Sequence, residues 1–238
     1  MYSAIFKLLP LFDAIRLSIL LFVRRYFFKF GKVIFSQTGE DIIIQWILKD
    51  IQNGFYLDVG CHHPYKISNT FQLYLKGWRG IAIDANPALI AKWKRKRKND
   101  IPIMAAISDE EKEVTFYEFK ESEANTMDEG MMREWKQKFN YRSERKLTTQ
   151  TLTTVLDTHL PKGQKIDLMT VDVEGNDFNV IKSIDLVVYR PKLIVVEIHG
   201  TDLSNIQQNE IYKYLISNNY NLVSFATMNG YFIDTTQA

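Results

Sequence analysis

Two short apolar runs, each ending in an acidic residue at a turn, constrain the fold of this 238-residue chain most strongly. The first covers residues 55–59 and leads into Gly60, and the second covers residues 81–84. Apolar runs of this length, bounded by turn residues, are typical of strands buried in a parallel sheet. Ligands of open α/β sheets bind beyond the carboxyl ends of the strands, so Asp58, Gly60 and Asp84 are predicted to share one binding site.

The rest of the chain alternates between extended and helical patterns, which predicts an α/β fold with a doubly wound, mostly parallel sheet and helices on both faces. Further extended segments are expected at residues 103–107, 114–119, 166–172 and 193–199. Helices are expected at residues 36–48, 68–77, from 87, from 152, at 178–184 and at 205–218. Strands at 222–225 and 231–233 are predicted to close the sheet as an antiparallel hairpin, turning at Asn229-Gly230.

The turn after the first strand indicates which nucleoside cofactor fits. A dinucleotide site needs further glycines so that the pyrophosphate can approach the backbone. Here Gly60 is followed by Cys61-His62-His63-Pro64. S-adenosylmethionine has no phosphate and needs only a turn beside its methionine portion, an acid for the ribose and an apolar slot for adenine. Gly60, Asp84 and residues 105–108 are placed to supply these, so the sequence favours S-adenosylmethionine.

Ordered sequence blocks between residues 36 and 200 resemble those of the FkbM-type methyltransferases, a branch of the class I S-adenosylmethionine-dependent enzymes. The blocks are residues 36–41, 57–61, 68–70, 75–80, 83–87, 106–109, 152–157, 172–175 and 197–199. The resemblance implies a Rossmann-like, seven-stranded class I fold and methylation of a hydroxyl on a sugar or secondary metabolite. It also implies cofactor contacts from Gln37, Asp58, Gly60, Cys61, Asn69, Asp84, Ala85, Asn86, Ile107, Ser108 and Asp172.

Two pairs of polar residues at the ends of later strands form the predicted acceptor site. Asp172 and Glu174 end one strand at a spacing of two, so they share a face if the strand is still extended there. Glu197 and His199 have the same spacing at the end of the next strand. A sugar hydroxyl is a poor nucleophile at neutral pH, so its methylation needs a general base or a metal ion.

Two mechanisms stay open for these residues. In one, His199 or Asp172 accepts the hydroxyl proton. In the other, Asp172, Glu197 and His199 bind a divalent cation that holds the acceptor oxygen. Two other functions also stay open: methylation of a nitrogen or carboxylate in a small metabolite, and a cofactor-binding scaffold, without catalysis, that is held at a membrane or in a dimer. The presence of all four polar residues favours catalysis, with a small molecule or a glycan as the acceptor.

Charge and cysteine content exclude some partners. The formal net charge of +2 does not indicate nucleic acid, and the basic run at residues 92–98 is predicted to be a solvated helix face. Cys61 is the only cysteine, which is consistent with a reducing compartment such as the cytoplasm.

Residues 120–147 are polar and weakly periodic, and are predicted to be an insertion that acts as a lid or is simply solvated.

Residues 1–35 are predicted to form a basic, hydrophobic helical segment ahead of a methyltransferase domain at 36–238. The segment has six basic residues and one acid, Asp13. Its uncharged stretch at residues 17–23 is far shorter than the ~20 residues that span a bilayer. Residues 1–30 are therefore expected to pack on the domain, to form a homodimer, or to contact the inner face of a membrane peripherally.

Overall fold

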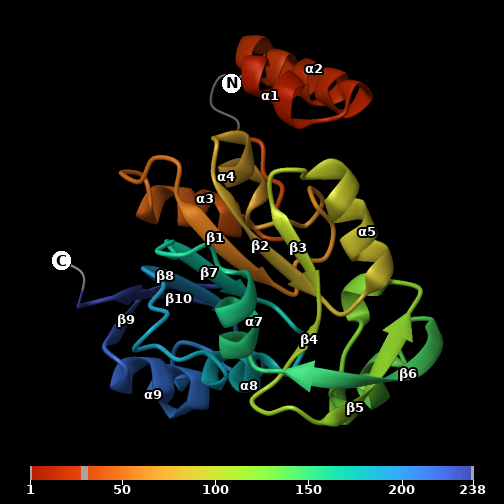
Figure 1. The fold of residues 1–238 in the computed structure, drawn as a ribbon, viewed down its shortest axis with the longest axis vertical. Coiled ribbons are helices and arrows are strands. Elements are labelled where there is room, and N and C mark those ends of the chain that lie inside the picture. Colours follow the sequence, from red (N-terminus) through yellow and green to blue (C-terminus); the bar gives the residue numbers. More distant parts are fainter. Residues whose placement is uncertain (1, 28–31, 237–238) are drawn as a thin grey trace.

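The computed structural model describes residues 2–27 and 32–236, and most of these surround one seven-stranded sheet (Figure 1). Phe28, Lys29 and Phe30 of the predicted N-terminal segment lie outside the described residues. The strand order is β3-β2-β1-β7-β8-β10-β9, with β10 antiparallel to both of its neighbours and the other pairs parallel. The predicted fold class is confirmed. The strands are β1 (Phe55–Val59), β2 (Arg79–Asp84), β3 (Ile101–Met104), β7 (Leu168–Val171), β8 (Leu193–Glu197), β9 (Tyr220–Ala226) and β10 (Asn229–Asp234).

Helices cover both faces of this sheet, because alternate side chains of each strand point to opposite sides. Leu57 and Val59 of β1 pack with α7 (Leu152–His159), α8 (Asp177–Lys182) and α9 (Glu210–Ser217), the last preceded by η2 (Ile206–Gln208). Tyr56 points to the other side and packs with α3 (Glu40–Ile47) and α4 (Phe71–Leu75). The helix α5 (Pro87–Lys96) lies on that second side, where Trp93 contacts Ala82.

A separate three-stranded sheet lies beside the main one and was only partly predicted (Figure 1). It contains β4 (Ala106–Ile107), β6 (Tyr141–Gln150) and β5 (Glu113–Phe119). The strand predicted at 103–107 is therefore wrong in extent, because it is divided between β3 and β4. The strand β6 was missed because its inward positions alternate Tyr141, Ser143, Arg145 and Leu147, so no apolar alternation marks it. Between β5 and β6 lie η1 (Ser122–Ala124) and α6 (Glu129–Trp135).

The C-terminal hairpin is present, but its predicted turn is wrong. Asn229 and Gly230 already pair with Ala226 and Phe225, so the turn is Thr227-Met228, with Thr227 at a φ of 59°. A Cβ atom on Gly230 would lie 2.6 Å from the ring of Phe232. The glycine is therefore needed for close packing within the strand rather than for the turn.

The N-terminal residues form a helical hairpin, α1 (Tyr2–Leu8) and α2 (Leu11–Phe27), that packs on α4 (Figure 1). Pro10 separates the two helices, as its missing N–H predicts. Five inward side chains pack against Phe71, Tyr74 and Leu75; these are Ile5, Leu9, Ala14, Leu17 and Leu21. Within residues 2–27 and 32–236, no helix is both long and apolar enough to cross a membrane.

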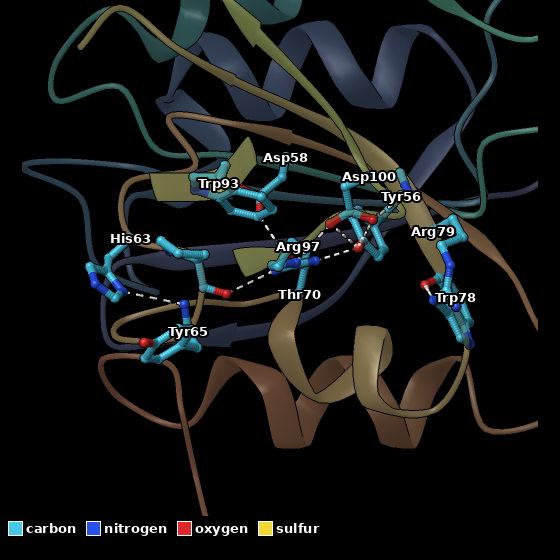
Figure 2. Close-up of polar contacts among 12 residues, drawn as sticks. Tyr56, Asp58, His63, Tyr65, Thr70, Trp78, Arg79, Trp93, Arg97 and Asp100 are labelled. Carbon is cyan, nitrogen blue, oxygen red and sulfur yellow. Dashed lines mark hydrogen bonds and ion pairs between the residues drawn. The ribbon is translucent and has the colours of Figure 1, made fainter. Parts of the chain in front are cut away.

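The basic run at residues 92–98 is only partly solvated, and the prediction for Arg97 is wrong. Lys94, Arg95 and Lys98 are exposed, but Arg97 is fully buried at the end of α5 (Figure 2). Its guanidinium lies 4.0 Å from the centre of the Trp93 ring, and its Nε donates to Asp100 Oδ2 over 2.7 Å. Arg97 and Trp93 are four residues apart and share the inward face of the helix. The sequence did not indicate this, because the other five residues from 92 to 98 are all basic as well.

Candidate active site

A cleft opens at the carboxyl ends of β1, β2, β7 and β8, where the sequence placed the binding site. Strand ends supply Asp58, Gly60, Asp84, Asp172 and Glu197 to its wall. Most residues predicted to contact the cofactor line this cleft; they are Gln37, Asp58, Gly60, Cys61, Asn69, Asp84, Ala85, Ile107 and Asp172. Residues chosen from the sequence thus line one continuous cleft although they lie far apart in the chain; Gln37 and Asp172 are separated by 135 positions.

Gly60 is required by the backbone of the first strand turn. Its φ is 78°, and a Cβ atom would lie 1.7 Å from the carbonyl oxygen of Asp172. The N–H groups of Gly60 and Cys61 both donate to the carbonyl of Ile83, over 2.9 and 3.0 Å. The turn is thus held between β2 and β7, and a side chain at position 60 would force these strands apart.

Asp84 organises the neighbouring turns through its carboxylate. One oxygen accepts from the N–H of His62 over 3.0 Å, and the other accepts from the N–H of Asn86 over 2.7 Å. Burial raises the pKa of Asp84 to about 6. Each carboxylate oxygen can accept a second hydrogen bond, so the group can still hold a ribose diol in the cleft.

Two residues predicted to contact the cofactor lie beside the cleft and not in its wall. Asn86 caps α5, its side chain accepting from the N–H of Ala88 over 2.9 Å. Ser108 is buried, and its hydroxyl donates to Asp109 over 3.2 Å. The sequence pattern identified the correct loops but could not tell which side of each loop faces the cleft.

Asp58 connects the cleft to the buried arginine (Figure 2). The hydroxyl of Thr70 donates to Asp58 Oδ2 over 2.6 Å and accepts from Arg97 Nη1 over 3.0 Å. Burial raises the pKa of Asp58 to about 6. Arg97 therefore acts as a positioning residue for the cleft wall, a role that its place in a basic run did not indicate.

The four predicted catalytic residues lie in one cluster at the cleft. His199 Nε2 is 2.9 Å from Glu197 Oε2 and 3.8 Å from Glu174 Oε2. Asp172, Glu174 and Glu197 line the cleft, whereas His199 does not and is placed beside Glu197. The strand is no longer extended at Glu174, because β7 ends at Val171 and Glu174 has a φ of 55°, so the condition on which Asp172 and Glu174 would share a face is not met.

Burial and mutual repulsion make this cluster retain protons. Desolvation, together with the nearby carboxylates, raises the pKa of Asp172 well above its usual range and that of Glu174 to about 8. The adjacent Glu197 carboxylate raises the pKa of His199 to about 9. At neutral pH the imidazole of His199 is thus a cation and the carboxyl of Glu174 is largely protonated.

The residues that could hold a metal ion differ from the predicted set. Glu174, Glu197 and His199 each bring one ligand atom within 4.8 Å of the others, whereas the sequence predicted Asp172 with Glu197 and His199. Glu174 takes the place of Asp172 in this set because the left-handed turn at Glu174 leaves its carboxylate 3.8 Å from the imidazole of His199.

The segment between β5 and β6 lies against the cleft, as a lid would. Its residues Ser122, Glu123, Asn125 and Met127 line the cleft. The hydroxyl of Thr126 donates to the carbonyl of Glu174 over 2.6 Å, which connects the segment to the cluster of Glu174, Glu197 and His199. His62 Nε2 lies 3.0 Å from the hydroxyl of Ser122, so one histidine of the turn after β1 also contacts this segment.

Other residues of the cleft wall were not predicted. Phe116 comes from β5 and supplies an aromatic surface to the wall. The turn residues Thr227 and Met228 also reach the wall. Alternation of apolar residues at 114–119 predicted a strand, but nothing in the sequence showed that this strand belongs to a second sheet that borders the cleft.

The comparison with protein families agrees with the resemblance seen in the sequence. Residues 58–222 match the family described as the methyltransferase FkbM domain. A TehB-like SAM-dependent methyltransferase from Corynebacterium glutamicum is 10% identical, with a TM-score of 0.44 over 93% of this chain and 99% of that one. Methyltransferase FkbM from Methylobacillus flagellatus is 11% identical, with a TM-score of 0.46 over 87% of this chain and 46% of that one. No curated protein matches the chain. On the match over residues 58–222, the chain belongs to the FkbM methyltransferase domain family.

Proposed function

We propose that this chain transfers a methyl group from S-adenosylmethionine to a hydroxyl of a sugar or glycan. Membership of the FkbM methyltransferase family supports the methyl transfer. The observation that supports a hydroxyl acceptor is the cluster of Glu174, Glu197 and His199 beside the predicted cofactor cleft.

The cleft fits S-adenosylmethionine better than a phosphate-containing cofactor. Among the described residues that line it, none is lysine or arginine, so no side-chain cation is available for a pyrophosphate. Asp84 offers a carboxylate for the ribose, and Ile107 and Phe116 offer an apolar slot for adenine. S-adenosylmethionine, when bound, supplies a methyl group already activated by its sulfonium. The protein then needs mainly to position the acceptor and to remove its proton.

The cluster suits an uncharged acceptor that has a proton to lose. A carboxylate acceptor is already ionised at neutral pH, so it has no proton to give to a base in the cleft. An amine acceptor would be held there as an ammonium ion, which is not a nucleophile. A hydroxyl carries no charge and gains from a nearby proton acceptor.

We assign proton acceptance to Glu197, supported by His199. Glu197 lines the cleft and ends 2.9 Å from His199, which is behind it. The pKa of about 9 leaves His199 protonated at neutral pH, so the imidazole is not a ready base there, and burial with the nearby carboxylates raises the pKa of Asp172 well above its usual range. A divalent cation held by Glu174, Glu197 and His199 is the alternative means of activating the hydroxyl.

A labelled-methyl transfer assay tests the proposal. Sugar nucleotides and lipid-linked sugars are compared with small amines and carboxylic acids, each with and without a chelator. We expect label in the sugars only, and a loss of about 100-fold or more in Glu197→Gln. Glu113→Gln, an exposed carboxylate on β5, is the matched control and should keep full activity. Label in amines or acids with inert sugars would refute the hydroxyl acceptor, and loss of activity with the chelator would select the cation mechanism.

A further inference from the structure

The outward face of α2 is a large exposed apolar surface. Its inward face packs on α4, yet large hydrophobic side chains also cover the opposite face. The outward set recurs at helical spacing and is between 37% and 73% exposed; it comprises Leu11, Phe12, Ile15, Ile19, Leu20, Phe22, Val23, Tyr26 and Phe27. Monomeric soluble proteins rarely expose an apolar patch of this size without a partner for it.

A groove beside α2 combines apolar walls with a basic rim. It has a volume of about 380 Å³ and lies between α2, α3 and α4. Its apolar wall comes from Leu21, Val33, Phe35, Ile42, Trp46 and Leu75. Its basic rim is Arg24, Lys32, Lys49 and Lys76, and among the described residues that line it none is acidic. Trp46 is 73% exposed at this rim.

We propose that the outward face of α2 and the basic groove bind the surface of an anionic phospholipid bilayer. In that arrangement the apolar side chains enter the boundary between headgroups and acyl chains, and the basic side chains contact lipid phosphates. An exposed tryptophan beside the groove suits the same interface. The proposal concerns attachment and is independent of the methyl-transfer reaction.

Charge complementarity favours a membrane over a second copy of this chain. The helical hairpin carries Lys7, Arg16, Arg24 and Arg25, and its one acid, Asp13, already pairs with Lys96 of α5. Two copies packed through this surface would bring basic groups together, whereas an anionic headgroup layer would neutralise them. The 17-residue α2 suits a helix that lies in the plane of the interface.

Vesicle flotation with the full chain tests this. We expect strong binding to vesicles of phosphatidylcholine with phosphatidylglycerol, weak binding to phosphatidylcholine alone, and release as salt increases. The double variant Phe12→Ser/Ile19→Ser should bind at least tenfold more weakly. Its matched control is Val187→Ser/Leu203→Ser, because Val187 and Leu203 are equally apolar, 92% and 68% exposed, and outside the hairpin.

Charge variants separate the electrostatic contribution. Reversing Arg16 to glutamate should weaken binding at least fivefold, since each basic residue near an anionic surface contributes about a fivefold change in affinity. Lys162→Glu makes the same charge change on an exposed loop and should have little effect. Thermal unfolding of every variant confirms that it is folded. Equal binding to both vesicle types would overturn the proposal. It would also be overturned if the chain bound no vesicles and instead formed a dimer that the double variant Phe12→Ser/Ile19→Ser dissociates.

Discussion

Replacing Arg97 with methionine should destabilise the protein by about 3–5 kcal/mol at pH 7, because it removes one partner of a fully buried ion pair. Methionine fills similar space and keeps the contact with Trp93, so the loss is mainly electrostatic. What remains is the carboxyl of Asp100, with hydrogen bonds from Tyr56 and Gly80 but no cation.

The pH dependence of the loss can be worked out from Asp100. Without Arg97, the buried carboxyl takes up a proton, whereas in the unfolded chain it has its usual pKa of 3.8. Keeping the Asp100 carboxyl protonated lowers the free energy of unfolding by about 1.36 kcal/mol for each pH unit above that pKa. The loss is therefore at most about 4.4 kcal/mol at pH 7 and about 1.6 kcal/mol at pH 5. The folded variant binds the extra proton in this range, so its stability falls as pH rises.

Urea unfolding at pH 5 and pH 7 measures this difference, with wild type at each pH as the reference. Arg95→Met, two residues away and exposed, is the matched control and should change the unfolding free energy by less than about 0.5 kcal/mol. The double variant Arg97→Met/Asp100→Asn should recover most of the stability lost at pH 7. A loss under about 1 kcal/mol, or one that is equal at both pH values, would refute the buried ion-pair argument.

Three further predictions concern the cleft. Gly60→Ala should cost about 3 kcal/mol or more in urea unfolding, whereas Gly163→Ala, with a similar φ of 77° but open space around it, should cost only about 1–2 kcal/mol. Glu174→Gln should raise the free energy of unfolding, most at pH 8 and least at pH 5, by an amount on the order of 2 kcal/mol at pH 8; the native pKa of about 8 exceeds the ordinary 4.5, so the stability due to this group falls as pH rises between them. Methyl transfer should increase as pH rises from 7 to 9, because the loss of protons from Glu174 and His199 makes the charge around Glu197 more negative and Glu197 a better proton acceptor, and His199→Gln should abolish the upper part of that increase.

The strands of the main sheet could be predicted because burial on both faces produces uninterrupted apolar runs. The runs that became β1 and β2 end in Asp58 and Asp84, and the topology of parallel sheets places such ends at one edge. The same reasoning brought Asp172 and Glu197 to that edge. Those predictions depended on chain direction and periodicity, which the sequence shows directly.

The remaining features depend on three-dimensional contacts that leave no periodic signal. Arg97 is buried because Tyr56, Thr70 and Asp100 satisfy it, and those partners are spread over 45 residues of the chain. Arg145 occupies an inward position of β6, where an apolar residue would have revealed the strand. Glu174 turns toward His199 only because the chain adopts a left-handed conformation there, which sequence alone did not indicate.

The most direct test of the central claim is the identity of the atom that receives the methyl group. The chain would be incubated with S-adenosylmethionine labelled in its methyl carbon and with a mixed pool of sugar nucleotides and lipid-linked sugars, and the labelled product analysed by NMR. We expect a new methyl resonance coupled through oxygen to a sugar carbon, absent when Glu197→Gln replaces the wild type. A methyl group on nitrogen or on a carboxylate, or no transfer to any sugar by wild-type protein, would contradict it.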